Sequence, residues 1–101
     1  MQPNEQAEII RRLRSAEGHL GAVIGMAESG EPCEQVLHQL GAVQAVLRAA
    51  GARLLTCQVK HSEDVIRNSL SPEDRAAELT RLRSLYQLLA QYPDYDRKIT
   101  T

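Results

Sequence analysis

The sequence has no phenylalanine and no tryptophan, and its 101 residues include only three tyrosines. Its apolar side chains are mostly leucine, alanine, valine and isoleucine, which suit the packing of helices against one another. Long apolar runs are also missing, since no segment approaches the roughly 18 apolar residues needed to cross a bilayer. The first residues, MQPNEQAEII, lack the basic start and apolar run of a signal peptide. We therefore expect a cytoplasmic protein with no membrane partner.

An excess of charge of one sign is absent as well. Twelve basic and thirteen acidic side chains give a net charge of −1, whereas nucleic-acid-binding domains usually carry a basic excess. The two cysteines, Cys33 and Cys57, are too few for a disulfide framework in a helical chain of this size. The composition therefore indicates one small cytosolic domain with reduced thiols, in which any binding to nucleic acid depends on where the basic residues lie.

No segment alternates apolar and polar residues as a half-buried strand does, and the spacing of apolar residues instead predicts three helices. The first is predicted from steps of three and four residues between Ile9 and Ala27, which place these side chains on one helix face. Asn4 is its expected N-cap, and Gly30 is its expected stop. Pro32 then suits the first turn of the next helix.

The second helix carries the strongest pattern in the chain, a heptad spacing sustained over four repeats. The heptad row consists of Val36, Leu40, Val43, Leu47, Ala50, Leu54, Cys57 and His61. No proline interrupts residues 33–70, and a helix of roughly 35 residues is about 50 Å long. A chain this small cannot cover so long a helix by itself, so the pattern predicts that copies of the chain associate.

The third helix is predicted to begin at the sequence SPED. Ser71 is its expected N-cap, the proline is its first residue, and Asp74 closes a capping-box-like pair. Its apolar face is formed by Leu79, Leu82, Tyr86 and Leu89. Pro93 ends the helix, and the polar residues after it predict a loose tail. The expected organisation is one all-α domain over residues 1–92 and a polar tail over residues 93–101.

The cysteines and one histidine are the candidates for chemistry. Cys33 lies in the first turn of the second helix, where the helix dipole and free amide groups favour the thiolate that binds metals and attacks electrophiles. Simple packing as a small apolar residue is the alternative for Cys33. Cys57 and His61 are four residues apart on one helix face, a spacing that lets two side chains reach one metal ion. Both also belong to the heptad row, where packing is their ordinary role.

Basic residues cluster near the start of the chain. Arg11, Arg12 and Arg14 lie on the face opposite Ile9 and Leu13. The second helix adds further basic residues, namely Arg48, Arg53, Lys60 and Arg67. A small basic patch is consistent with phosphate contacts, although a solvated face is its ordinary role. Because there is no nucleophile elbow, phosphate-cradling glycine loop, zincin motif or CxxC, we expect no enzyme.

Three segments resemble the copper-sensitive operon repressor family, which includes CsoR, RcnR and FrmR. They are RRLRSAEGHL, ESGEPCEQVLHQLGAVQAVL and GARLLTCQVKH, and the likeness runs over about residues 9–67. The resemblance implies an all-helical, antiparallel homodimer with a four-helix-bundle core, which pairs into a flat homotetramer. It also implies a repressor that binds operator DNA through Arg12 and Arg14, with Arg11 beside them. Such a repressor releases DNA when an inducer reaches the sensing cysteine, here Cys33.

The sequence departs from this family at the metal ligands. Copper sensors have a histidine 25 residues after the sensing cysteine and a second cysteine four residues later, but Gln58 and Ser62 stand there in this chain. Nickel and cobalt sensors require histidine at both positions, and persulfide sensors require the second cysteine, where this chain has Ser62. Glutamine and serine are poor ligands for a soft ion. The copper site of the family therefore does not transfer, and only Cys33 remains from it.

The resemblance leaves three sensing mechanisms possible. A rearranged site for Cu(I) or another transition metal ion would combine Cys33 with Cys57 and His61 of the partner subunit, which lie one residue before the family positions and so about 100° around the helix. Thiol chemistry at Cys33 would instead sense formaldehyde, an oxidant or a persulfide. The N-terminal proline amine of the formaldehyde sensors is not matched, because Pro3 is internal. A redox disulfide between Cys33 and Cys57 across the dimer is the third.

We therefore predict a DNA-binding repressor whose response depends on Cys33, with operator DNA and further copies of itself as partners. The alternative is a helical metal-binding or scaffold protein that has lost operator binding, which the net charge of −1 fits slightly better. A steep loss of DNA affinity with rising salt would distinguish the repressor from this alternative.

Overall fold

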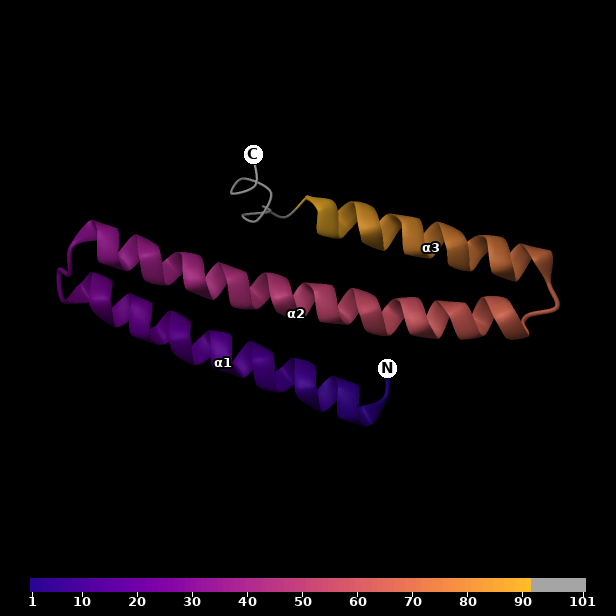
Figure 1. Cartoon of the computed structure of the whole chain (residues 1–101), viewed down its shortest axis with the longest axis horizontal. Coiled ribbons are helices and arrows are strands. Elements are labelled where there is room, and N and C mark those ends of the chain that lie inside the picture. The colour runs from indigo at the N-terminus through magenta and orange to yellow at the C-terminus, as the bar shows by residue number, and fades with distance from the viewer. Residues whose placement is uncertain (92–101) are drawn as a thin grey trace. The chain divides into compact units, whose positions relative to one another are not determined.

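The structure, a computed structural model, describes residues 1–91 and consists of three helices joined by short connections (Figure 1). Helix α1 spans Pro3–Glu28, α2 spans Cys33–Asn68 and α3 spans Pro72–Ala90. No strand occurs among these described residues, and none of the helices in that part of the chain has an apolar stretch long enough to span a membrane. The predicted all-α fold with a long central helix is confirmed. The tail expected over residues 93–101 lies outside the described residues.

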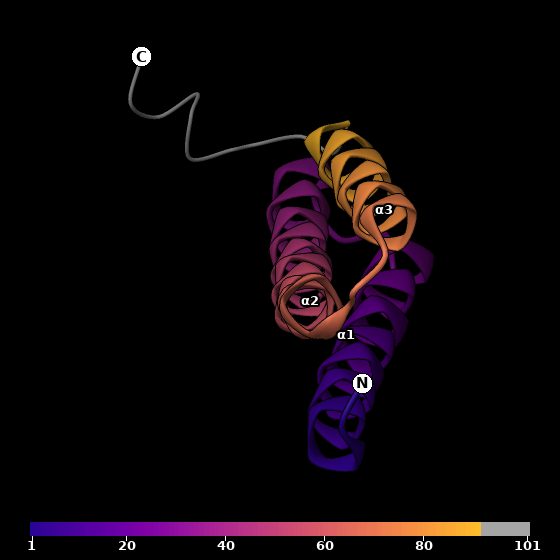
Figure 2. The same ribbon diagram turned by 90° about the vertical axis from the view of Figure 1, so that its right-hand side faces the viewer.

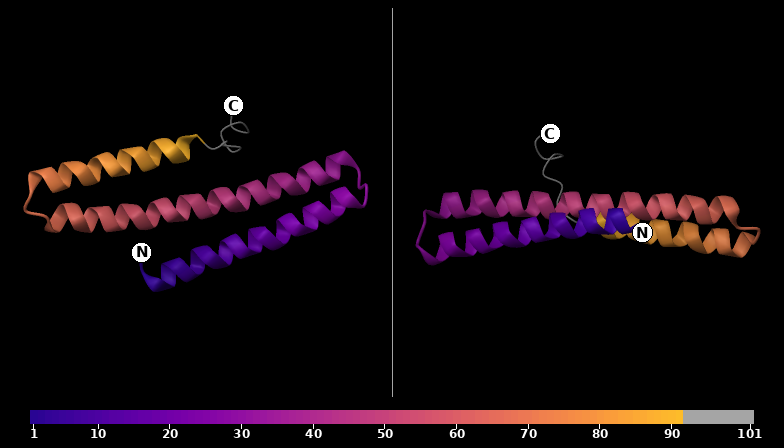
Figure 3. Two further views of the ribbon diagram at one scale, coloured as in Figure 1. Left: turned by 180° about the vertical axis from the view of Figure 1, so that it is seen from behind. Right: turned by 90° about the horizontal axis from the view of Figure 1, so that it is seen from below.

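The chain divides into two compact units that share α2. The N-terminal unit, Met1–Leu54, contains α1 and the first part of α2, and the C-terminal unit, Leu55–Thr101, contains the rest of α2 and α3. Within each unit the two helical segments run side by side in opposite directions (Figures 1 and 3). The single domain expected over residues 1–92 stays a prediction.

Helix α1 begins earlier than the expected cap. Gln2 is the N-cap residue, in an extended conformation and without a side-chain capping bond, and its carbonyl accepts from the amide of Gln6 at 2.9 Å. Pro3 is the first helical residue, a position that suits proline because the first amides of a helix have no intrahelical partner. Asn4 therefore lies inside the first turn, and the prediction of Asn4 as the N-cap is wrong.

Gly30 closes the turn between α1 and α2. Its φ of 73° is in the left-handed region that favours glycine. The amides of Gly30 and Glu31 donate to carbonyls of the last turn of α1 at 3.2 and 3.0 Å, which are the two bonds of a Schellman motif. The carbonyl of Pro32 then accepts the first hydrogen bonds of α2. The turn thus ends α1 as predicted and places Cys33 at the first position of α2.

The N-terminus of α3 is capped by Ser71, as predicted. The Oγ of Ser71 accepts from the amide of Asp74 at 3.2 Å, and Pro72 is the first helical residue. The second half of the expected capping box is not made by Asp74, because the amide of Ser71 donates to the Oγ of Ser69 at 3.2 Å. Arg75 Nη1 also donates to the carbonyl of Ser69 at 2.8 Å. These bonds hold the short connection between α2 and α3, which faces the viewer in Figure 2.

The heptad row of α2 is only half buried. Its buried positions, seven residues apart, are Val43, Ala50 and Cys57. The alternate positions include Leu47 and Leu54, which remain 46% and 40% exposed. On α1 the buried positions are Ile9, Ala16 and Val23, whereas Leu13 and Leu20 of the same stripe are exposed. Helices α1 and α2 therefore each bury one set of their apolar residues within the chain and leave leucines of the other set exposed.

Candidate functional site

Cys33 is the first residue of α2, and its side chain is exposed. The amide groups in the first turn of a helix lack intrahelical acceptors, and they make this end of the helix electropositive. The predicted position of Cys33 is therefore confirmed. Packing of this thiol as a small apolar residue does not occur within the single chain. Its exposure lets a small molecule reach the sulfur.

Cys57 and His61 lie near the other end of α2, in the C-terminal unit. Cys57 is buried on the heptad row, whereas His61 is exposed. Although they are four residues apart, these two side chains therefore have different surroundings. Among residues 1–91, no three histidine, cysteine, aspartate or glutamate side chains are grouped so that they could hold a metal ion. A rearranged metal site with Cys33 and a partner subunit stays a prediction.

Gln58 and Ser62 form a hydrogen-bonded network with Glu78 of α3. The Nε2 of Gln58 donates to Ser62 Oγ at 3.0 Å and to Glu78 Oε1 at 3.3 Å. The hydroxyl of Ser62 donates to the same Glu78 oxygen at 2.6 Å. Ser62 is 0% exposed, so these bonds satisfy a hydroxyl that water does not reach. This Gln58–Ser62–Glu78 network joins the last part of α2 to α3 within the C-terminal unit.

The network stands at the two positions where the resembling copper sensors have a histidine and a cysteine. It presents an amide, a hydroxyl and a carboxylate, whereas Cu(I) prefers soft thiolate and thioether ligands. The hydroxyl of Ser62 already takes part in two hydrogen bonds, one as acceptor and one as donor. The residues at these positions therefore do not fit a copper ion.

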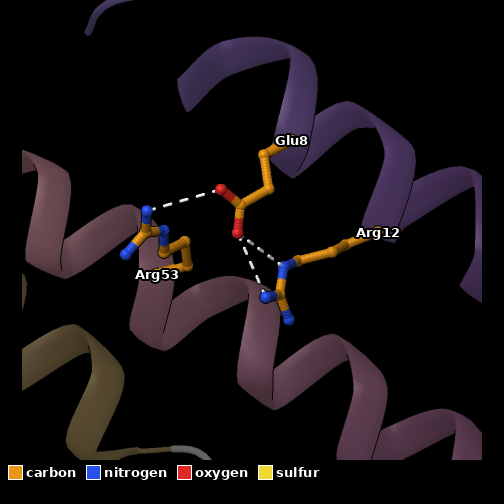
Figure 4. A network of polar contacts seen from close by, with 3 residues as sticks. All are labelled: Glu8, Arg12 and Arg53. Atoms are coloured by element: carbon orange, nitrogen blue, oxygen red, sulfur yellow. Dashed lines mark hydrogen bonds and ion pairs between the residues drawn. The ribbon is translucent and has the colours of Figure 1, made fainter. Parts of the chain in front are cut away.

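A second polar network lies in the N-terminal unit (Figure 4). Glu8 Oε1 accepts from the Nε and Nη2 of Arg12 at 3.2 and 3.1 Å, and Glu8 Oε2 accepts from the Nη2 of Arg53 on α2 at 3.4 Å. The side chains of Arg12 and Arg53 are 42% and 36% exposed. The hydrogen bond from Arg12 and the charges of Arg53, Arg12 and Arg11 hold the pKa of Glu8 below its usual 4.5. This Glu8–Arg12–Arg53 network is therefore an ionic contact open to solvent.

The three arginines predicted to contact DNA are all exposed on α1. Arg11 and Arg14 flank Arg12, which Glu8 holds. Sequence reasoning singled out neither Glu8 nor Glu78. The spacing of four residues between Glu8 and Arg12 was a visible signal for an ion pair on one helix face. Glu78 lies 20 and 16 residues from its two partners, so no local spacing indicates its contacts.

Comparison with known proteins places the chain in a family. A family model described as metal-sensitive transcriptional repressor matches residues 5–90. The copper-sensing transcriptional repressor CsoR of Mycobacterium ulcerans (strain Agy99) is 44% identical to this chain over 46 residues. That segment is 46% of this chain and 39% of the relative. No solved structure gives a significant match. Because the family match includes nearly all of the three helices, the chain belongs to the family of metal-sensitive transcriptional repressors.

Proposed function

We propose that this protein is a cytoplasmic, DNA-binding transcriptional repressor that leaves its operator when a thiol-reactive inducer engages Cys33. Its family is one of transcriptional repressors and not of enzymes, in agreement with the lack of catalytic motifs in the sequence. The observation that carries the assignment to Cys33 is its exposure at the first position of α2. The Gln58–Ser62–Glu78 network supports thiol chemistry over Cu(I), because it puts an amide, a hydroxyl and a carboxylate where Cu(I) would need softer ligands.

The DNA contacts are assigned to Arg11, Arg12 and Arg14. Arginine side chains bind phosphate oxygens through charge-assisted hydrogen bonds, which makes the affinity fall as salt rises. The net charge of −1 is an average over the chain, whereas the exposed arginines lie within four positions of α1. Association of several chains would repeat this patch along the DNA. Arg14→Ala is expected to weaken DNA binding without changing the reaction of Cys33.

Self-association into an antiparallel dimer with a four-helix-bundle core, and then a tetramer, is part of the proposal. The leucines that each helix leaves exposed support it, above all Leu47 and Leu54 on α2. Covering such side chains stabilises an assembly by about 25 cal/mol per Å² of apolar surface. Light scattering should give a tetramer for the wild type and smaller species for Leu47→Glu with Leu54→Glu. A monomeric wild type would refute this part of the proposal.

The turn between α1 and α2 connects the two functions. Cys33 begins α2 immediately after the turn at Gly30, and this turn joins α2 to the helix that carries the arginines. A group added to the Cys33 sulfur therefore lies beside the turn that sets the orientation of α1 relative to the start of α2. For release, the inducer has to bind the DNA-free arrangement more tightly than the DNA-bound one, by the same factor as the loss of DNA affinity.

The test is fluorescence anisotropy with labelled DNA from the region upstream of the protein's own gene. Reduced, anaerobic protein would receive buffered Cu(I), Ni(II), formaldehyde or a persulfide donor in turn. The variants are Cys33→Ser and its matched control Cys57→Ser, which changes the buried cysteine. The expected result is that a thiol-reactive compound releases the wild type and the Cys57→Ser variant, but not the Cys33→Ser variant.

Other results would change the proposal in defined ways. Release by a metal ion alone, lost in both cysteine variants, would favour the rearranged site with Cys57 and His61 of the partner subunit. Release that needs both cysteines and an oxidant would favour a disulfide between Cys33 and Cys57. No DNA binding even at low salt would refute the repressor and favour the helical metal-binding or scaffold protein.

A further inference from the structure

We propose that Arg12 and Arg53 form one phosphate-binding pair for the DNA backbone, and that the carboxylate of Glu8 occupies this pair until a phosphate replaces it. The inference rests on the DNA binding proposed above. It adds a residue of α2 to the DNA contacts and an acidic residue that opposes them.

The geometry of the pair is that of an anion site. Two guanidinium groups, one from α1 and one from α2, converge on a single carboxylate (Figure 4). Arg12 places two N–H donors on one oxygen of Glu8, at 3.1 and 3.2 Å, while Arg53 reaches the other oxygen at 3.4 Å. Arginine recognises carboxylate and phosphate with the same planar fork of donors. A group that binds Glu8 in this way is therefore suited to bind a phosphate.

Glu8 does not use all the donors that the two arginines offer. Each guanidinium has five N–H donors, whereas Glu8 supplies two oxygens. The Nε of Arg53 is buried and has no hydrogen-bond partner among the described residues. A backbone phosphate presents two anionic oxygens, as a carboxylate does, so it can accept from both guanidinium groups in place of Glu8.

The charge and exposure of the network also favour exchange. Glu8 supplies one negative charge against the two positive charges of Arg12 and Arg53, which leaves the network positive. The side chains of Arg12 and Arg53 are 42% and 36% exposed, so an anion from solvent can approach them. Exposed ion pairs contribute little to stability. Replacement of Glu8 by a phosphate should therefore leave the helices in place.

The experiment compares four variants with the wild type. Glu8→Gln removes the competing charge, and Glu5→Gln removes the same charge one turn earlier on α1. Arg53→Ala removes the proposed contact on α2, and Arg67→Ala removes another exposed arginine from the same helix. DNA affinity is measured by anisotropy over a range of salt concentrations. In parallel, inorganic triphosphate is titrated while NMR follows the Nε–Hε signals of the arginines.

We expect Arg53→Ala to weaken DNA binding by about tenfold, the loss of one charge-assisted hydrogen bond, and to lower the salt slope by about one. Arg67→Ala should have a smaller effect. Glu8→Gln should bind DNA about fivefold more tightly than Glu5→Gln, as expected for removing one charge at about 4 Å from a phosphate. Triphosphate should shift the signals of Arg12 and Arg53, and more readily in Glu8→Gln.

The inference would be overturned if Arg53→Ala and Arg67→Ala changed the DNA affinity equally. It would also be overturned if Glu8→Gln and Glu5→Gln did so. If Arg53→Ala does not fold, as judged by circular dichroism, Arg53→Lys takes its place, because it keeps the charge and loses the planar fork. If the wild type binds triphosphate through Arg12 and Arg53 but binds no DNA, the repressor function fails and the anion site stands. If neither the DNA affinity nor the triphosphate affinity changes in Glu8→Gln or Arg53→Ala, the proposed anion site is refuted.

Discussion

The Glu8–Arg12–Arg53 network and the Gln58–Ser62–Glu78 network each join two of the described helices, and they differ in exposure and in charge. In the N-terminal unit, Glu8 holds two arginines that are 42% and 36% exposed, at 3.1 to 3.4 Å. In the C-terminal unit, the fully buried Ser62 donates to Glu78 at 2.6 Å. An exposed ion pair can exchange its partner for a ligand at little cost, whereas opening the second network leaves buried polar groups unpaired. The first network is therefore suited to respond to a ligand, and the second is suited to hold structure.

The largest effect is expected from converting the C-terminal network into the ligand set of the copper sensors. Gln58→His combined with Ser62→Cys should raise Cu(I) affinity by more than the roughly 10- to 100-fold that outer-shell residues contribute to metal sites, because it supplies an imidazole and a thiolate. Competition with a chromophoric Cu(I) chelator measures this change. The gain should disappear when Cys33→Ser is added. A wild type that binds Cu(I) as tightly as the double variant would contradict the conclusion that Gln58 and Ser62 do not fit a copper ion.

The next effect concerns the stability of the C-terminal network. Ser62→Ala should lower the free energy of unfolding by about 1–3 kcal/mol, because it removes the hydroxyl that bridges Gln58 and Glu78 in a buried place. Urea unfolding at one fixed protein concentration measures the loss. Ser84→Ala is the matched control, since Ser84 is exposed and its hydroxyl donates to the Thr80 carbonyl of its own helix. Similar losses for both variants would show that burial of the network is unimportant.

A smaller effect is expected in the N-terminal network. Glu8→Gln should lower the free energy of unfolding by less than Ser62→Ala does, because its ion pairs with Arg12 and Arg53 are exposed to water and salt. Thermal and urea unfolding of the two variants side by side give the comparison. A loss as large as that of Ser62→Ala would mean that Glu8 holds structure rather than a ligand site.

The smallest effect is a dependence on pH. The pKa of Glu8 lies below its usual 4.5, chiefly because Arg12 donates to its carboxylate. A lowered pKa means that the ion pair stabilises the folded state fully above about pH 4.5 and that this stabilisation is lost as pH falls through the folded value. The difference in unfolding free energy between wild type and Glu8→Gln should therefore shrink on acidification. Glu73, whose pKa is also lowered, is present in both proteins. Its contribution to the pH dependence therefore cancels in the difference between their unfolding free energies.

Much of the fold follows from local sequence. The heptad spacing predicts α2, Gly30 predicts the end of α1, and Ser71 predicts the start of α3, because each depends on neighbours within a few residues. The position of Cys33 at the start of α2 follows in the same way. Asn4 shows the limit of such rules, since the fixed φ of Pro3 suits the first helical position and the cap falls on Gln2 instead.

The sequence by itself determined the helices, the turn at Gly30 and the position of Cys33 at the start of α2, and it places Gln58 and Ser62 where the resembling copper sensors have a histidine and a cysteine. Only the tertiary structure decided that these two residues bond to Glu78, and that Glu8 reaches Arg53 across 45 positions of the chain. The physical reason is that periodicity places a residue on a helix face, whereas the identity of its partner depends on which faces pack together. For the same reason, the heptad row predicted an apolar seam but not which of its residues the chain itself would bury.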